Sequence, residues 1–178
     1  MAPGMERVVF PSGPLIGSPE WHQDLDQYFA FLDVQIKVNG FVIQAVADGS
    51  MTYCYTVGLY RHLVETPDGS FGLPELFIAG LAPFDAHRIL TPAAQSSLEF
   101  DGPPGEIPVT EDRIAKIVHG RSCHTRGLRC DILHQYYQDH VLVSQVVWPA
   151  ENGAYPWDPA WPYDASVQPL LDAWSPAK

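Results

Sequence analysis

The sequence has no long hydrophobic run and little positive charge, and each absence excludes a class of protein. No stretch approaches the ~20 apolar residues of a membrane-spanning helix, and the first residues lack the pattern of a secretion signal. The chain of 178 residues has 10 Lys and Arg against 21 Asp and Glu, a formal net charge of -11. Such a charge repels nucleic acids and anionic membranes. We therefore expect a cytoplasmic protein that binds neither.

Cysteines are scarce, and the sequence predicts neither a disulfide framework nor a metal site. There are three, Cys54, Cys123 and Cys130, and an odd number fits a reducing compartment. Together with His124 and His134, the last two cysteines could supply zinc ligands. Zinc sites usually pair ligands two or four residues apart, so the adjacency of Cys123 and His124 argues against a shared ion. We predict free thiols, no metal and no cofactor.

Three short hydrophobic segments, Phe41–Ala47, Tyr53–Leu59 and Leu76–Ile78, predict the centre of the fold. Val, Ile, Tyr and Phe dominate these segments, and Gly, Pro, Asp and Ser separate them, as is typical of strands. Strands so close together along the chain favour an antiparallel sheet. The length of the chain fits one domain. We predict a single α+β domain with a mainly antiparallel sheet.

Two principal helices are predicted to pack on one face of this sheet. Apolar residues recur at helical spacing within Glu20–Asn39, at Leu25, Phe29, Leu32 and Ile36. A second helix is expected at Phe84–Leu90, where Pro92 would kink or restart it before Leu98.

The remaining segments complete the predicted organisation. Tyr60–Leu73 is expected to be a loop, Asp131–Tyr137 a short helix and Val141–Trp148 a buried strand. We expect an extended N-terminal arm over residues 1–19, the α+β domain over 20–171 and a C-terminal tail over 172–178.

Several short motifs follow one another in order between residues 25 and 171. They are Tyr-Cys-Tyr-Thr-Val-Gly-Leu from Tyr53, Leu-Pro-Glu-Leu from Leu73, Gly80-Leu81, Val147-Trp148, Tyr155–Pro159 and Gln168–Leu171. Their order and spacing resemble an uncharacterised bacterial family, domain of unknown function 4262. The resemblance implies a bacterial or phage origin and an α+β fold, and it implies no established reaction.

Three residues near these motifs are candidates for catalysis: Glu75, His62 and Tyr55. Glu75 stands at the entrance of an apolar strand, where burial can shift the pKa of a carboxyl group toward that of a general base. The alternative is a structural carboxylate that pairs with an arginine or caps backbone N–H groups. His62 follows the Tyr53–Leu59 segment closely, and for it the alternative is a hydrogen-bonded surface histidine.

Four further residues are candidates for lining a pocket: Thr56, Gly58, Trp148 and Trp157. Thr56 and Gly58 could shape a pocket beside Tyr55, and Gly58 would permit a positive φ or a close backbone approach. The alternative is a core strand that ends at a bulge. The tryptophans could form a wall on which a ligand stacks, or they could seal an edge of the sheet.

The segment Arg113–Cys130 contains five basic residues and no acidic residue, so the remainder of the chain carries -11 minus 5, or -16. Within it we predict an anion-binding site formed by Arg121, His124, Arg126 and Arg129. The alternative is internal ion pairing, which is the commoner use of such residues.

The sequence therefore leaves two classes of function open. The acidic charge favours a binding or interaction protein, such as an accessory or immunity-like factor, with a basic protein partner. The alternative is a small enzyme that acts on an anionic small molecule in a pocket near Tyr55, His62 and Glu75. A deep pocket that gathers these three residues would favour the enzyme.

Overall fold

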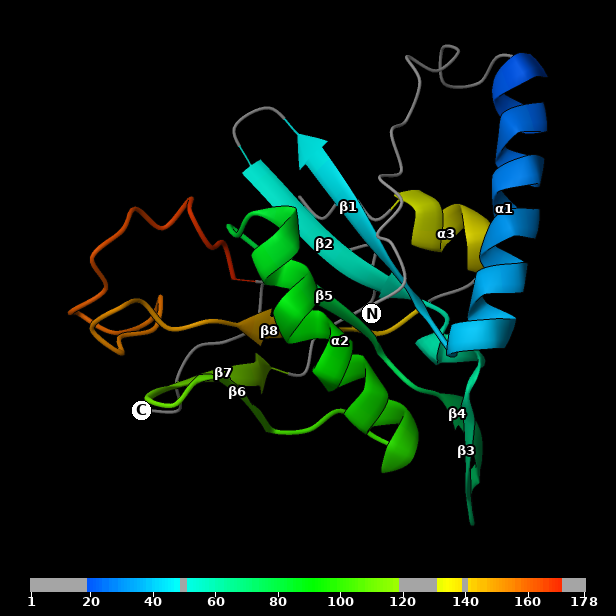
Figure 1. Cartoon of the computed structure of the whole chain (residues 1–178). Helices are drawn as coiled ribbons and strands as arrows, with labels where there is room; N and C mark the ends of the chain where they lie inside the picture. The colour runs from blue at the N-terminus through cyan, green and yellow to red at the C-terminus, as the bar shows by residue number, and fades with distance from the viewer. Residues whose placement is uncertain (1–18, 49–50, 119–130, 139–140, 171–178) are drawn as a thin grey trace, which may run out of the picture.

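A six-stranded sheet forms the centre of the structure, a computed structural model that describes residues 19–48, 51–118, 131–138 and 141–170 (Figure 1). In spatial order the strands are β1 (Val42–Asp48), β2 (Met51–Val57), β5 (Glu75–Ala79), β8 (Val143–Val147), β7 (Arg113–Val118) and β6 (Glu106–Thr110). β5 and β8 are parallel, and every other neighbouring pair is antiparallel. The predicted α+β fold with a mainly antiparallel sheet is confirmed.

Apolar side chains on both faces of the central strands create two hydrophobic cores. Successive residues of a strand point to opposite faces of a sheet. Accordingly, Cys54 and Ile78 contribute to one core, whereas Tyr55 and Phe77 contribute to the other. All five residues of β5 are buried, because this strand is covered on both faces.

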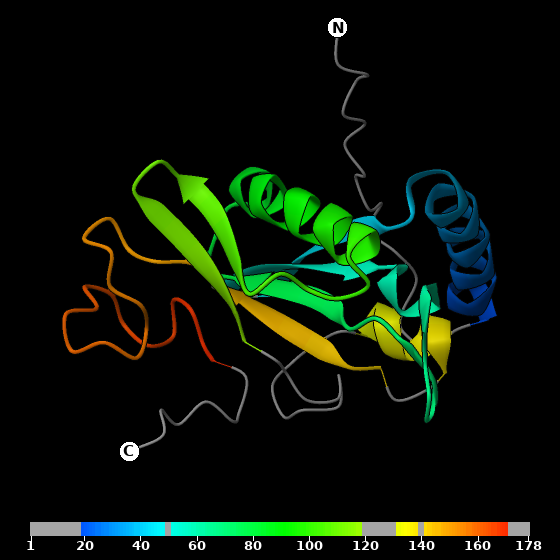
Figure 2. The same ribbon diagram turned by 90° about the horizontal axis from the view of Figure 1, so that it is seen from below.

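The helices cover opposite faces of the central strands; they are α1 (Pro19–Asn39), α2 (Pro83–Glu99) and α3 (Asp131–Tyr137). Leu90 of α2 packs into the core that contains Cys54, whereas Leu32 of α1 and Leu133 of α3 pack into the other core. Figure 2 shows α2 above the sheet and α3 below it. The prediction that both principal helices share one face is wrong, because β2 and β5 are apolar on both faces and each face needs a cover.

Along the chain, the main departure of the two principal helices from prediction is at Pro92. α1 ends where expected, since Gly40 has a φ of 83° and its N–H donates to the carbonyl of Ile36 at 2.7 Å. α2 continues past Pro92 as one helix to Glu99. Pro92 is exposed, while Leu90 and Ala93 on the inward face are buried. Packing of that face outweighs the hydrogen bond that proline cannot make.

The predicted loop at Tyr60–Leu73 contains a 3₁₀ turn and a small hairpin. The turn is η1 (Leu59–Arg61), and the hairpin pairs β3 (Leu63–Thr66) with β4 (Gly69–Gly72). The Thr66 hydroxyl donates to the Gly69 carbonyl at 2.7 Å and closes the expected turn. Most of the hairpin is exposed, so it lacks the hydrophobic pattern from which a strand is predicted.

From residue 148 to residue 170 the chain packs beside the sheet in turns and irregular structure. Gln168 fixes it, because its side-chain oxygen accepts the Trp148 N–H and its amide donates to the Trp148 carbonyl, each at 2.9 Å. Within the described parts of the chain, no helix combines the length and hydrophobicity that a membrane crossing requires.

Candidate functional site

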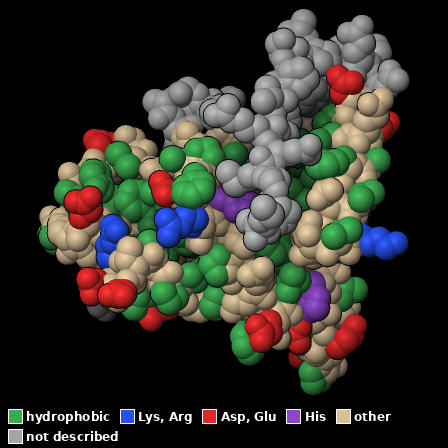
Figure 3. Space-filling view, in the orientation of Figure 1, with side chains coloured by type: hydrophobic (Ala, Val, Ile, Leu, Met, Phe, Trp, Pro, Cys, Tyr) green, Lys and Arg blue, Asp and Glu red, His purple; other side chains and the backbone are tan. Residues whose placement is uncertain are grey.

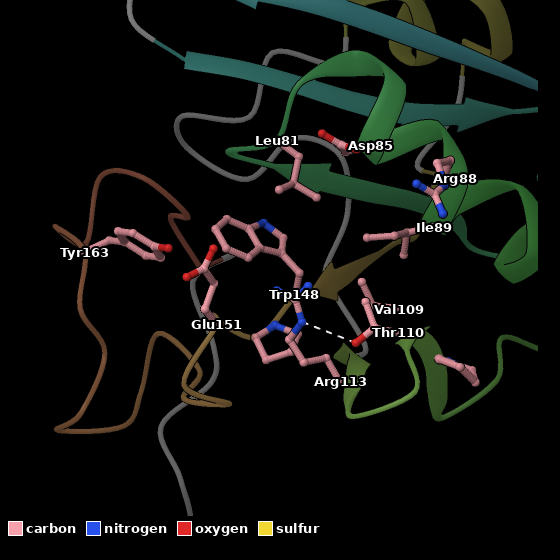
Figure 4. Close-up of a pocket in the computed structure, with 12 residues that line it drawn as sticks. Leu81, Asp85, Arg88, Ile89, Val109, Thr110, Arg113, Trp148, Glu151 and Tyr163 are labelled. Carbon is pink, nitrogen blue, oxygen red and sulfur yellow. Dashed lines mark hydrogen bonds between the residues drawn. The ribbon is translucent and has the colours of Figure 1, made fainter.

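A cavity of about 590 Å³ lies where α2, the β6–β7 hairpin and the segment after β8 meet (Figure 4). Leu81, Ile89 and Val109 supply part of its apolar lining. In Figure 4 the indole of Trp148 stands in the middle of the view, with Tyr163 on one side and Ile89 on the other. Residues far apart in the sequence therefore form one recess, and its volume suits a small molecule.

Trp148 is a rigid wall of this cavity. Its side chain is 9% exposed, and its indole N–H donates to the Ala79 carbonyl at 2.8 Å. Its backbone is bound on both sides by Gln168. The rings of Trp161 and Tyr163 lie 5.5 Å and 6.1 Å from the Trp148 ring, centroid to centroid. These contacts hold the indole in place before any ligand arrives.

Two arginines and two carboxylates also line the cavity. Arg88 comes from α2 and Arg113 from β7, and Asp85 and Glu151 are the acids. The Nε–H of Arg113 donates to the Thr110 hydroxyl at 3.3 Å, the dashed line in Figure 4. Among the described residues neither arginine forms an ion pair. Apart from the bond to Thr110, their guanidinium N–H groups can form charge-assisted hydrogen bonds with an anion.

Glu75 lies in a second polar cluster and is completely buried. Its Oε1 accepts hydrogen bonds from the N–H of Gly58 at 2.8 Å, the N–H of Tyr60 at 3.1 Å and the hydroxyl of Tyr137 at 2.6 Å. Its Oε2 accepts the hydroxyl of Thr56 at 2.6 Å. Of the two roles predicted for Glu75, these contacts match the structural one, the capping of backbone N–H groups.

Burial governs the electrostatics of this cluster. Removal from water raises the pKa of Glu75 above its ordinary value, and the four hydrogen bonds offset part of that rise. Burial beside the same carboxyl group raises the pKa of Tyr137 as well. Glu75 does not line the cavity described above. Its hydrogen-bonding capacity is used inside the protein, where it joins the ends of β2 and β5 to α3.

Gly58 is required by the backbone beside Glu75. It has a φ of 129°, and a Cβ there would lie 2.7 Å from the Gly40 carbonyl oxygen and 2.9 Å from the Phe41 Cα. Both the positive φ and the close backbone approach considered for this residue are present. Its conformation also points its N–H at Glu75.

The structure places the three candidate catalytic residues in different environments. Tyr55 is buried in the core beneath α1, with its ring 6.4 Å from that of Tyr53. His62 is partly exposed, and its Nε2 lies 2.7 Å from a carboxylate oxygen of Asp101. Neither contacts Glu75 through a hydrogen bond among the described residues.

The four candidate pocket residues also divide into separate groups. Thr56 and Gly58 bind Glu75, whereas Trp148 lines the cavity. Trp157 stacks on Tyr155 with ring centroids 4.9 Å apart and does not line the cavity.

The predicted anion-binding residues Arg121, His124, Arg126 and Arg129 lie outside the described residues, as do Cys123 and Cys130. Cys54 is buried and free, and burial raises the pKa of its thiol to about 11.

Three residues of the cavity and the Glu75 cluster are not predicted from the sequence: Arg88, Tyr163 and Tyr137. Arg88 and Tyr163 belong to segments with no recognisable motif, and only the fold brings them together. Tyr137 reaches Glu75 across 62 positions of the sequence. The one available signal was the Tyr136-Tyr137 pair in a short predicted helix, because a buried tyrosine hydroxyl usually has a partner.

Comparison with known proteins identifies a family and gives no relative of known activity. The family model described as Domain of unknown function (DUF4262) matches residues 35–162. No curated protein and no solved structure matches the chain. The resemblance drawn from the motifs is thereby confirmed.

Proposed function

The chain belongs to the DUF4262 family of unknown function, and we propose that it binds a small anionic molecule in the cavity beside Trp148. The observation that carries this proposal is the pair of arginines, Arg88 and Arg113, that line the cavity without an ion pair among the described residues. The chain has twice as many acidic as basic residues, so carboxylate partners for these arginines are plentiful. Two arginines that lack an ion pair in a recess therefore favour a role in binding an anionic ligand.

The aromatic side chains of the cavity indicate which uncharged group the ligand carries. The fixed indole of Trp148 and the neighbouring ring of Tyr163 offer a surface on which a planar or apolar group can lie. Ile89 and Val109 extend that surface. We therefore expect an anion that carries an aromatic or apolar group, such as an aromatic carboxylate, and we expect a bare inorganic anion to bind more weakly.

The two carboxylates limit which anions fit. Asp85 and Glu151 place negative charge on the lining of the same cavity. A ligand with several negative charges would be repelled by them, whereas a single carboxylate near an arginine would not. A second, positive group on the ligand could face Asp85 or Glu151. We therefore favour monoanions and zwitterions over polyphosphates.

A thermal-shift screen followed by calorimetric titration tests the proposal. The panel contains aromatic monocarboxylates, their uncharged amides as matched controls, aromatic amino acids, phosphate and sulfate. Aromatic carboxylates should raise the melting temperature by mass action, and the amides should not. Substitution of Arg88 or Arg113 by alanine should weaken binding at least ~10-fold, because each removes a charge-assisted hydrogen-bond donor.

Lys116→Ala is the matched control for the loss of one positive charge. Lys116 lies on β7 with Arg113, but its ammonium group lies 4.6 Å from the ring centroid of Tyr155, and it does not line the cavity. This variant should bind the ligand as the wild type does. If no anion stabilises the protein, or if stabilisation persists in both arginine variants, the cavity is not the binding site we propose.

A further inference from the structure

The outward face of α1 carries an apolar stripe made of Phe31, Val34 and Val38. Their spacings of three and four residues align them along the helix. Their exposed fractions are 46%, 59% and 75%, whereas Leu32 and Ile36 on the inward face are buried. Figure 3 shows hydrophobic side chains along this helix, acidic groups near its N-terminal end and a basic group toward its other end. Single exposed apolar residues are ordinary, but a continuous stripe marks an interaction surface.

Charges on one flank of the stripe favour a second copy of the same helix as the partner. Asp26 and Lys37 are eleven residues apart, about three turns, so they lie on the same flank. Both are exposed, and neither forms an ion pair within the described residues. Asp33, on the same flank, is already engaged by Arg61 at 2.7 Å and by the Tyr136 hydroxyl. Asp26 and Lys37 therefore stand at opposite ends of this flank of α1, without an ion pair among the described residues.

We propose that this protein forms a symmetric dimer through antiparallel packing of two α1 helices. Phe31 would pack against Val34 of the partner subunit, and Lys37 would face Asp26 of the partner subunit. Two-fold symmetry repeats each contact. For Lys37 to face Asp26 of the partner subunit, the two-fold axis must cross α1 midway between these residues, between positions 31 and 32. For Phe31 to face Val34 of the partner subunit, it must cross between positions 32 and 33. One axis can therefore satisfy the apolar and the charged contacts together.

In a symmetric parallel arrangement the two copies of this flank would lie on opposite sides of the interface, so neither Asp26 nor Lys37 would meet its counterpart. Only the antiparallel arrangement brings Lys37 beside Asp26 of the partner subunit, so the charge pattern favours it. The interface also lies on a different element from the cavity, whose lining comes from α2, the β6–β7 hairpin and the C-terminal segment. The dimer and ligand binding can therefore be tested separately.

Sedimentation velocity over a range of protein concentrations tests the dimer. The wild type should sediment as a dimer, and Val34→Asp should sediment as a monomer, because it places two charges at the centre of the interface. Lys37→Asp should weaken association ~10-fold or more through repulsion by Asp26 of the partner subunit. The double variant Asp26→Lys with Lys37→Asp should restore association, since it exchanges the charges and keeps their complementarity.

Phe100→Asp is the control for a charge placed on another exposed apolar residue. Phe100 is 72% exposed just after α2 and is not part of the α1 stripe, so its variant should remain dimeric. A monomeric wild type, a dimer that survives Val34→Asp, or a double variant that fails to recover would each overturn the proposal. A monomeric wild type whose melting temperature drops with Val34→Asp would show instead that the chain itself covers the stripe.

Discussion

The Glu75 cluster and the cavity beside Trp148 use charge in opposite ways. Glu75 is fully buried, and four donors from its own chain surround its two oxygens. Arg88 and Arg113 line a recess, and no carboxylate among the described residues pairs with them. One region satisfies its polar groups within the protein, whereas the other leaves them available to a molecule from outside.

From this difference we expect the two regions to have different roles. A buried carboxylate with every donor in place stabilises the fold, since removal of either side leaves unsatisfied groups in a dry interior. Arg88 is exposed and Arg113 is half-buried, and neither forms an ion pair among the described residues, so both add little to stability. We therefore expect substitutions at Glu75 to change the free energy of unfolding and substitutions in the cavity to change affinity.

The largest effect is expected from Glu75→Ala. The substitution removes the shared acceptor of Thr56, Gly58, Tyr60 and Tyr137 and opens a space in the interior. It should lower the free energy of unfolding by ~3–5 kcal/mol, as measured by urea denaturation. The control is Glu65→Ala, which removes an exposed carboxylate from β3 and should change the same quantity by less than ~0.5 kcal/mol. Equal stability of the two variants would contradict a structural role for Glu75.

A smaller effect is expected from Tyr137→Phe. The ring can keep its edge-on contact with Tyr60, whose centroid is 5.2 Å away. The hydroxyl is lost, which donates to Glu75 and accepts the N–H of Gly58, each at 2.6 Å. The free energy of unfolding should fall by ~1–2 kcal/mol. Tyr163→Phe removes an exposed tyrosine hydroxyl at the cavity and should leave it unchanged. If both variants lower the free energy of unfolding equally, the hydrogen bond from Tyr137 to Glu75 does not stabilise the fold as predicted.

The pH dependence of stability gives a third comparison. The pKa of Glu75 is raised in the folded protein above its ordinary value of 4.5. The folded state therefore keeps this proton at pH values where the unfolded chain has lost it. The contribution of Glu75 is complete below pH 4.5 and is lost as the pH rises through the raised folded pKa.

Glu75→Gln isolates that contribution, because the amide has no proton to lose. The stability of the wild type relative to this variant should decline as the pH rises above 4.5. A wild type that gains stability relative to Glu75→Gln over the same range would show a lowered pKa and reverse this assignment.

The sequence predicted the central elements because their local patterns agree with the final structure. The apolar segments around Tyr55 and Phe77 form β2 and β5, and the helical spacing of Leu25, Leu32 and Ile36 places the inward face of α1. The faces that the helices cover were not predicted correctly. Both faces of β2 and β5 are apolar, and a strand pattern of that kind does not say which helix covers which face.

The candidate sites were harder to predict because they depend on contacts between distant segments. Glu75 was identified from its place at the entrance of a strand, but its partner Tyr137 lies on α3. Trp148 was identified from the aromatic composition of the C-terminal segment, and Arg88 was not identified at all. Arg88 is an exposed residue of an amphipathic helix, and only the neighbouring β6–β7 hairpin makes it part of a cavity.

One measurement tests the division between the two regions most directly: the melting temperatures of Glu75→Gln and Arg113→Ala, each with and without a saturating aromatic monocarboxylate that stabilises the wild type. Arg113→Ala should melt like the unliganded wild type and lose the ligand-induced rise. At neutral pH Glu75→Gln should shift the melting temperature of the unliganded protein and keep that rise. If Glu75→Gln abolishes the rise while Arg113→Ala preserves it, the binding site lies at Glu75 and not in the cavity.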